Sequence, residues 1–362
     1  MNQYYEVTAV SADASELARV AMKYGVKHHH VEMTREISPV KDILAVIKLF
    51  RYLRKEKPEI VHSHTPKAGI VGMMAAWLAG VPNRFHTVAG LPLMEATGTK
   101  RKILNQVESL TYRFATKVYP NSYGLKEIIL EQKFCSPEKL KVLGQGSSNG
   151  IDTSHFMVEQ ISINEREQLR TALEISSHDF LFIFVGRLVG DKGINELVQA
   201  FKQLQTVENG KNPKLLLVGP LETELDPLLP QSLREIETNN AILNVGYQDD
   251  VRPYFAIADA LVFPSYREGF PNVVLQAGAM ELPAIVSDIN GCNEIIINGE
   301  NGLIIPAKNV DELKDAMLKL IKNKELYNKL KKNARLRIVE NYEQSVVWQA
   351  ILDEYRKVEN NV

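Results

Sequence analysis

Short apolar runs alternate with longer helical patterns along the whole chain. Such runs are typical of buried strands, and strands that alternate with helices predict parallel sheets covered on both faces. The predicted strands of the first half are Glu6–Val10, His29–Met33, Glu59–His62, Arg84–Val88, Lys117–Pro120 and Lys141–Gly144. Those of the second half are Phe180–Val185, Lys214–Val218, Ala241–Val245, Ala260–Phe263, Ala284–Val286 and Gly302–Ile305.

The repeated pattern predicts two doubly wound α/β domains, because each half of the chain carries its own set of strands and helices. Ser, Asn, Glu and Gln replace the apolar periodicity near 155–172, so we expect domains over 1–160 and 161–344. A final helix near Ser345–Val358 is expected to return to the first domain as segment 345–362. An earlier helix, Lys41–Lys57, has one apolar stripe formed by Ile43, Leu44, Ile47, Phe50 and Leu53.

The start of the chain is unusual for such a domain. A doubly wound domain normally opens with a buried strand, a Gly-rich turn and a helix. Here Tyr4–Val10 follows Met1 almost at once and leads through a polar segment into the predicted helix Glu16–Tyr24. We therefore expect the first strand of the first domain to be missing.

Composition supports this picture and adds a charge asymmetry. The chain is 45% hydrophobic and 24% charged, as is usual for globular proteins. Its 362 residues are too many for one domain with a single hydrophobic core. Two cysteines cannot form a disulfide framework, and no apolar run approaches the roughly 18 residues of a membrane span. No signal peptide is evident either, so we expect a cytoplasmic protein.

The charge of the chain is unevenly distributed. Residues 1–160 hold 21 Lys and Arg against 15 Asp and Glu. This excess of positive charge suggests an anionic partner such as a phospholipid surface; the alternative is ordinary scatter in a chain of this size.

Two loops in the second half carry candidate chemistry. Gly186-Arg187 follows the predicted strand Phe180–Val185, and Lys192 comes shortly after, so two cations lie where an open α/β sheet binds ligands. Glu268 follows Ala260–Phe263 and opens the sequence E-G-F-P-N before a helix. A helix N-terminus with two cations suits a diphosphate, and the carboxylate suits a polar substrate. The alternative is a solvated turn and an ordinary helix start.

Other motifs indicate less. Gly144–Gly150 lacks the spacing of a dinucleotide-binding loop, so we interpret it as a tight link. His28–His30 cannot converge on a metal, because neighbouring side chains in a strand point to opposite faces. His62 and His64 end a strand and either line a cleft or cap that strand. Residues 97–117 place a basic cluster beside an apolar helix, which suits either an anionic membrane or a core-facing helix with a solvated end.

Taken together, these residues resemble the retaining glycosyltransferases of the GT4 family (group 1 glycosyltransferases), and the resemblance covers nearly the whole chain. It rests on the run H-S-H-T-P-K-A-G over His62–Gly69, on Arg84–Leu91, and on the order and spacing of Gly186-Arg187, Lys192-Gly193 and Glu268–Ala279. The resemblance implies the GT-B fold, in which two Rossmann-like domains face each other across a cleft.

The resemblance also implies roles for individual residues. Arg187 and Lys192 would bind the donor's diphosphate and stabilise the leaving group, and Glu268 would hold the transferred sugar. No metal and no cofactor beyond the nucleotide sugar is expected. The remaining implied donor contacts are Gly186, Gly269, Phe270, Pro271, Asn272, Val273 and Gln276, and the possible acceptor contacts are His64, Lys67, His86 and Thr87.

Three features depart from the family pattern. Gln276 stands where the family usually has a second Glu that holds the ribose, although an amide also accepts from a hydroxyl. Ala89 replaces a histidine of the first-domain loop, in Thr87-Val88-Ala89-Gly90. The third departure is the first strand, which in the family borders both donor and acceptor.

The resemblance implies a hexosyltransferase that moves a sugar, with retention, from a UDP-hexose or UDP-N-acetylhexosamine to a lipid-linked glycan in capsule or lipopolysaccharide assembly. Such an enzyme would be cytoplasmic and membrane-peripheral, and no nucleic-acid partner is expected. The alternatives are a truncated or non-catalytic GT-B protein that binds a nucleotide or a partner enzyme, and a sugar-nucleotide epimerase of the same fold, for which no acid/base carboxylate set is evident.

Overall fold

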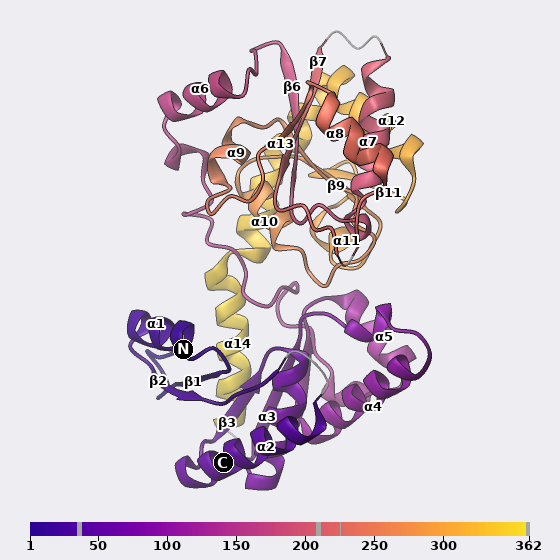
Figure 1. Cartoon of the computed structure of the whole chain (residues 1–362). Helices are drawn as coiled ribbons and strands as arrows, with labels where there is room; N and C mark the ends of the chain where they lie inside the picture. Colours follow the sequence, from indigo (N-terminus) through magenta and orange to yellow (C-terminus); the bar gives the residue numbers. More distant parts are fainter. Residues whose placement is uncertain (35–37, 208–210, 225, 360–362) are drawn as a thin grey trace. The chain divides into compact units, whose positions relative to one another are not determined.

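The computed structural model describes residues 1–34, 38–207, 211–224 and 226–359 and shows two compact units (Figure 1). Unit 1 comprises Met1–Ser148 and Gln349–Val362, and unit 2 comprises Asn149–Trp348. The division lies in the glycine-rich segment 144–150, a dozen residues before the boundary expected from the polar composition. Ile151 already packs in the core of unit 2, which explains the earlier position.

Unit 2 is built on one parallel sheet with the strand order β11-β10-β9-β6-β7-β8. Its strands are β6 (Asp179–Val185), β7 (Asn212–Val218), β8 (Ile242–Asn244), β9 (Ala260–Phe263), β10 (Ala284–Ser287) and β11 (Gly302–Ile305). Its α-helices are α6 (Ile163–Ala172), α7 (Ile194–Gln205), α8 (Pro230–Thr238), α9 (Arg252–Ile257), α10 (Asn272–Ala279), α11 (Cys292–Ile295), α12 (Val310–Lys322) and α13 (Lys324–Tyr342).

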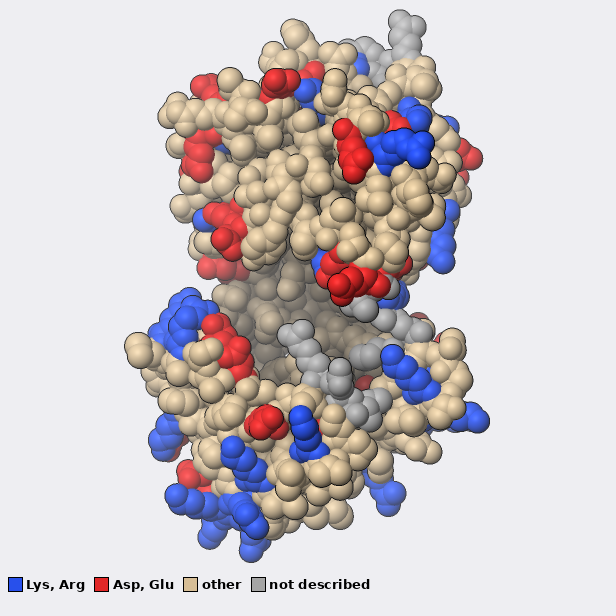
Figure 2. Space-filling model, in the orientation of Figure 1, with Lys and Arg blue, Asp and Glu red and all other residues tan. Residues whose placement is uncertain are grey.

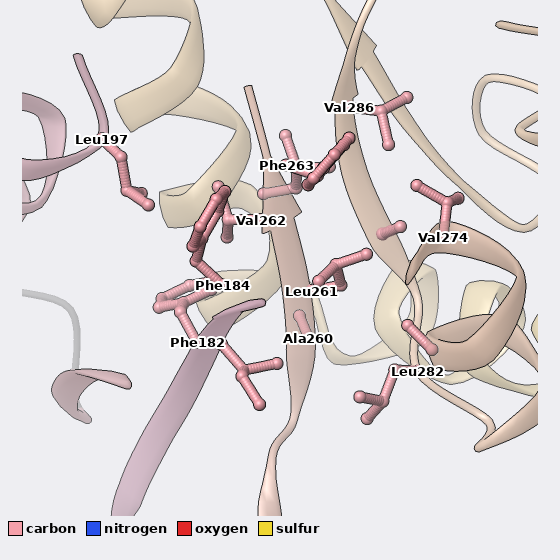
Figure 3. Packing of buried hydrophobic residues seen from close by; sticks show 14 of the residues in the cluster. Phe182, Phe184, Leu197, Ala260, Leu261, Val262, Phe263, Val274, Leu282 and Val286 are labelled. Carbon is pink, nitrogen blue, oxygen red and sulfur yellow. The ribbon is translucent and has the colours of Figure 1, made fainter. Parts of the chain in front are cut away.

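The central strands of this sheet are buried on both faces. Every residue of β9 is buried, and its neighbours on β6 pack with it in one large core (Figure 3). The rings of Phe184 and Phe263 stack at 5.9 Å between centroids. Continuous apolar runs such as F-L-F-I-F-V are the sequence form of such strands, which is why the predicted strands of this half closely match the observed ones.

Unit 1 contains two separate parallel sheets. Its strands are β1 (Thr8–Ser11), β2 (Lys27–His30), β3 (Ile60–Ser63), β4 (Asn83–Val88) and β5 (Lys117–Pro120). β1 pairs with β2, and β3-β4-β5 form the second sheet, so among the described residues no strand joins the two. Its α-helices are α1 (Ala14–Tyr24), α2 (Pro39–Glu56), α3 (Pro66–Ala79), α4 (Gly98–Phe114) and α5 (Tyr123–Glu131).

Two expectations for unit 1 were wrong. Segment 141–144 is not a strand, although the amide of Lys141 still bonds to the carbonyl of Val118 at the end of β5. The apolar stripe predicted for the second helix is only partly its buried face, because Leu53 is buried and the first three members of the stripe are not. α2 packs on α3 through Ala45, Val46, Leu49 and Leu53, whereas Ile43, Leu44 and Ile47 are exposed.

The last helix, α14 (Gln344–Glu359), begins in unit 2 and ends in unit 1. Within unit 1 its apolar side chains pack beside Phe85 and Tyr119 of the three-stranded sheet. The Tyr355 hydroxyl lies 2.6 Å from Nδ1 of His62 on β3. The described part of the chain contains no helix that is long and apolar enough to cross a membrane.

Candidate active site

The strand order of unit 2 places a ligand crevice at one point of its sheet. From β6 the chain continues to β7 and β8 on one side, and later to β9, β10 and β11 on the other. The loops that leave the carboxyl ends of β6 and β9 therefore diverge, which opens the space where α/β sheets bind ligands. These are the two loops that carry Arg187, Lys192 and Glu268.

The loop after β6 presents two cations. Arg187 is half-exposed, and its guanidinium donates to Oε2 of Glu222 at 2.8 Å. Lys192 ends the short 3-10 helix Gly190–Lys192, and α7 begins directly after Gly193. Gly193 has φ of +70°, and a Cβ there would lie 2.1 Å from the carbonyl oxygen of Pro264. Only glycine allows this close approach, which brings the β6 loop against the β9 loop.

The loop after β9 brings Glu268 directly to Lys192. The Lys192 ammonium donates to Oε1 of Glu268 at 2.5 Å, and the Ser265 hydroxyl donates to the same oxygen at 2.9 Å. The side chains of Lys192 and Glu268 are only 17% and 16% exposed. The structure thus joins two predicted site residues from separate loops into one partly buried ion pair.

Side chains that sequence reasoning missed hold these loops together. The guanidinium of Arg267 donates to Oδ2 of Asp191 at 2.6 Å, and the amide of Tyr266 donates to the carbonyl of Asp191 at 2.9 Å. The Asp191 amide in turn bonds to Oδ2 of Asp226 at 2.6 Å. Asp191 lies within the motif that supplied Lys192, but no pattern in the sequence links it to Asp226 or Arg267.

A third loop supports the start of α10. Asn290, after β10, donates through Nδ2 to the carbonyl oxygens of Glu268 (3.1 Å) and Gly269 (2.8 Å). The next residue, Gly291, has φ of +77°, and a Cβ there would lie 2.4 Å from the Gly269 oxygen. α10 begins at Asn272 without a side-chain cap, so its first turn keeps backbone N–H groups and the positive end of the helix dipole for a ligand.

Of the remaining predicted donor contacts, Gly186 follows β6 and donates its amide to the carbonyl of Val218, whereas the others lie at the start of α10. Phe270 and Pro271 are buried, and the ring of Phe270 packs on Tyr342 at 5.4 Å, so these residues offer backbone rather than side chain. Asn272 is exposed, and Val273 and Gln276 are half-exposed on the same helix.

Three of the predicted acceptor residues, His64, His86 and Thr87, lie with His62 in a histidine-rich cluster at the carboxyl ends of β3 and β4 in unit 1. His62 Nε2 lies 2.7 Å from the Thr87 hydroxyl, and the rings of His62 and His64 lie 4.3 Å apart. His86 is buried beside the Ser63 hydroxyl at 2.8 Å. Of the four predicted residues, His64 is the one classed as exposed, while Lys67 pairs with Asp42 at 2.7 Å.

His62 and His86 in this cluster have a lowered pKa, so their surroundings favour the neutral imidazole. Burial, with a smaller effect from His64, lowers the pKa of His86 to about 3. Burial also keeps the pKa of His62 well below its usual range. Among the described residues, no group of three or more His, Cys, Asp and Glu is placed to hold a metal ion.

Comparison with known proteins establishes the family. The profile of a family described as "Glycosyl transferases group 1" matches residues 165–337, and that of a "Glycosyl transferase 4-like domain" matches residues 2–146. The capsular polysaccharide biosynthesis glycosyltransferase CapM of Staphylococcus aureus is 33% identical over 350 residues, covering 97% of this chain and 89% of CapM. This chain belongs to the group 1 glycosyltransferases. It is therefore a transferase, as the resemblance implied.

Two further comparisons refine the setting of this glycosyltransferase. The UDP-Gal:alpha-D-GlcNAc-diphosphoundecaprenol alpha-1,3-galactosyltransferase of Escherichia coli is 32% identical over 315 residues, covering 86% of this chain and 78% of that enzyme. The crystal structure of Anabaena Alr3699/HepE in complex with UDP and glucose superposes with a TM-score of 0.80 at 18% identity, over 97% of this chain and 91% of that one. The predicted GT-B fold is thereby confirmed.

Proposed function

We propose that this glycosyltransferase moves a hexose or N-acetylhexosamine, with retention, from a UDP-sugar to a polyprenyl-diphosphate-linked glycan in surface polysaccharide synthesis. The observation that carries the proposal is the pairing of Lys192 with Glu268 across the two loops at the switch point of unit 2, one of which also carries Arg187. The names of two relatives, a capsular polysaccharide enzyme and a galactosyltransferase that acts on a diphosphoundecaprenol, support donor and acceptor class.

In this proposal the two cations bind the diphosphate of the donor. Arg187 offers a planar fork that fits phosphate oxygens, and Lys192 offers a point charge. The first turn of α10 adds backbone N–H groups. These groups stabilise the negative charge that grows on the leaving diphosphate, so they contribute most in the transition state. With this charge already balanced by the protein, we expect transfer to need no metal ion.

Glu268 takes the role of sugar contact. Its Oε1 already accepts from both Lys192 and Ser265, so its second oxygen is the one suited to a sugar hydroxyl. When a diphosphate binds Lys192, part of the ammonium's hydrogen bonding moves to the phosphate, and the carboxylate gains capacity for the sugar. Gln276 lies on α10, one turn after the first helical residue Asn272, and we propose that its amide contacts the ribose.

Retention follows if the acceptor attacks from the side of the leaving group. The bond between the anomeric carbon and the phosphate oxygen breaks, and the acceptor oxygen forms its bond to that carbon on the same face. The acceptor's proton passes to the departing phosphate oxygen, so no separate base is needed. This route suits a chain whose first-domain loop has Ala89 and whose His86 is buried.

Transfer of radiolabelled sugar to a lipid-linked acceptor tests the proposal. We expect Glu268→Gln and Lys192→Ala each to lower kcat by about 100-fold or more, because Lys192 stabilises charge on the leaving diphosphate and Glu268 positions both Lys192 and the transferred sugar. Gln205→Ala, an exposed change on α7 away from the loops, serves as the matched control and should retain full activity. Equal activity of wild type and Glu268→Gln removes Glu268 from the mechanism. UDP binding without transfer by the wild type would favour a non-catalytic nucleotide-binding role.

A further inference from the structure

The outer face of α2 in unit 1 is apolar. Val40, Ile43, Leu44 and Ile47 are 72%, 60%, 61% and 39% exposed. Their spacing of three and four residues places them on one side of the helix, opposite the face that packs on α3. Isolated exposed apolar residues are ordinary, but four neighbours on one helix stripe are not. We call these four residues the α2 stripe.

Positive charge borders the α2 stripe. Five exposed basic residues of the same helix flank or extend it, namely Lys41, Lys48, Arg51, Arg54 and Lys55. The helix has two acidic residues: Asp42 forms an ion pair with Lys67, and Glu56 is the last helical residue. The outward face thus combines apolar and cationic side chains with little opposing charge. Lys and Arg also cover more of the visible face of unit 1 than Asp and Glu do (Figure 2).

From this arrangement we infer that α2 docks unit 1 on an anionic phospholipid surface, with the α2 stripe in the interface and the flanking cations at the headgroups. A helix with an apolar stripe between Lys and Arg side chains is the form that lies in a membrane interface. A protein partner would need a matching acidic rim, whereas an anionic bilayer supplies that charge everywhere. The inference deepens the proposed function, because a lipid-linked acceptor lies in such a surface.

The helix α4, whose basic cluster and apolar residues also suit a membrane, fits this role less well. Its exposed large apolar residues are Ile103 and Leu110, each about two-fifths exposed and separated by Gln106 and Ser109 on the outward side. Arg101, part of its basic cluster, bonds instead to the carbonyl of Leu93 and to Asn105. α4 therefore lacks a continuous apolar stripe and serves as the internal comparison.

Vesicle flotation with the full chain tests the inference. Wild type should float with vesicles of phosphatidylcholine and phosphatidylglycerol and bind pure phosphatidylcholine weakly. The double variant Ile43→Ser/Leu44→Ser should bind the anionic vesicles at least about tenfold more weakly, and Lys48→Glu/Arg51→Glu should lose most of the dependence on anionic lipid. Ile103→Ser on α4 and Ile163→Ser on α6, both at exposed apolar positions, should leave binding within about twofold.

Three outcomes would overturn the inference: absence of wild-type binding to anionic vesicles, equal binding by the Ile43→Ser/Leu44→Ser variant, or a wild-type dimer that this variant abolishes, which would make the stripe a contact between copies. Transfer assays separate this result from the proposed function. The double variant should retain activity toward a water-soluble, short-chain acceptor and lose it toward acceptor embedded in vesicles. If wild type binds vesicles but transfers no sugar, the proposed function fails and the membrane contact stands.

Discussion

The two units use the same parallel strands and helices but bury them to different degrees. In unit 2 one sheet runs through six strands, and the four residues of β9 are all buried. In unit 1 the strands form two sheets, and none of the four residues of β1 is classed as buried. Val10 on β1 is 38% exposed, whereas Val262 on β9 is fully buried.

The difference shows what continuity of a sheet contributes. A strand inside a parallel sheet has partner strands on both edges and helices on both faces, so both its backbone and its side chains are buried from solvent. β1 and β3 each pair with a single described strand, so their other edges lack strand partners within the described residues. Unit 2 thus provides a rigid base for the site loops, whereas we expect unit 1 to open locally at lower free energy.

Hydrogen exchange should show the largest contrast. Amides of β6 and β9 should exchange at least about 100-fold more slowly than those of β1 and β3, because opening the continuous sheet exposes far more apolar surface. Native-state exchange followed by mass spectrometry or NMR measures both sets in one sample. Equal protection of β1 and β6 would contradict the proposed difference in local stability.

A matched pair of valine substitutions should show the next largest difference, in the unfolding free energy that each strand loses. Val262→Ala removes buried methyl groups and should cost about 2–3 kcal/mol of unfolding free energy, whereas Val10→Ala should cost less than about 1 kcal/mol. Urea unfolding gives both values. Trp348→Phe leaves Trp77 to report on unit 1, and Trp77→Phe leaves Trp348, at the end of unit 2. Similar costs at both positions would contradict the proposed difference in burial between the two strands.

Lowering the pH should reduce the folding stability of unit 1. The folded pKa of His86, about 3, lies below the ordinary histidine value of about 6.5, so the unfolded state takes up the proton first. Stability is full above about pH 6.5 and falls as the pH drops toward 3, by roughly 2 kcal/mol at pH 5 from this residue alone. Unfolding of the Trp348→Phe protein, followed through Trp77 from pH 7 to 5, measures the slope.

The control for this pH dependence is His86→Gln in the same background. It lowers stability at neutral pH if packing against Gly69 is lost, but its stability should depend less on pH than that of the parent. An unchanged slope would assign the acid sensitivity to other groups, of which His62 is the first candidate.

Removing one ion pair from each unit should have the smallest effects, on UDP affinity in unit 2 and on stability in unit 1. The Arg187–Glu222 pair in unit 2 is about half-exposed, so removing its carboxylate should free Arg187 for phosphate. We expect Glu222→Gln to tighten UDP binding by at most about fivefold, the range of exposed pairs, and Glu224→Gln on the same loop to leave it unchanged. Asp42→Asn, which breaks the Lys67 pair of unit 1, should lower stability without changing UDP affinity. Calorimetry that shows weaker UDP binding by Glu222→Gln would indicate that Glu222 contacts the donor itself.

Sequence reasoning came closest where a strand is a short run of mostly buried residues. The predicted strands Lys117–Pro120, Ala260–Phe263 and Gly302–Ile305 match β5, β9 and β11 residue for residue, because an apolar run marks a strand whose side chains leave water. Segment 141–144 has similar composition but no strand partner beyond one backbone bond to Val118, so it stays irregular. Pairing is a tertiary property that composition alone does not decide.

The residues of the candidate site also fall into two groups, those that the sequence could indicate and those that only the structure revealed. Arg187, Lys192 and Glu268 could be proposed as candidates from the sequence, because charged residues at the ends of apolar strands form a recognisable pattern. Ser265 and Asn290 could not, because a single Ser or Asn in a loop resembles any surface residue. Each gains its role only from the Glu268 loop that it bonds.

By itself the sequence determined the order of strands and helices apart from segment 141–144, the two-domain α/β class and the identity of the charged residues at the strand ends, because these follow from local periodicity and turn chemistry. The tertiary structure decided which charges meet: Lys192 and Glu268 lie 76 positions apart and pair only because β6 and β9 are neighbours. It also decided which side of α2 is buried. The helix carries two apolar faces, and packing on α3 covers one and leaves the α2 stripe exposed.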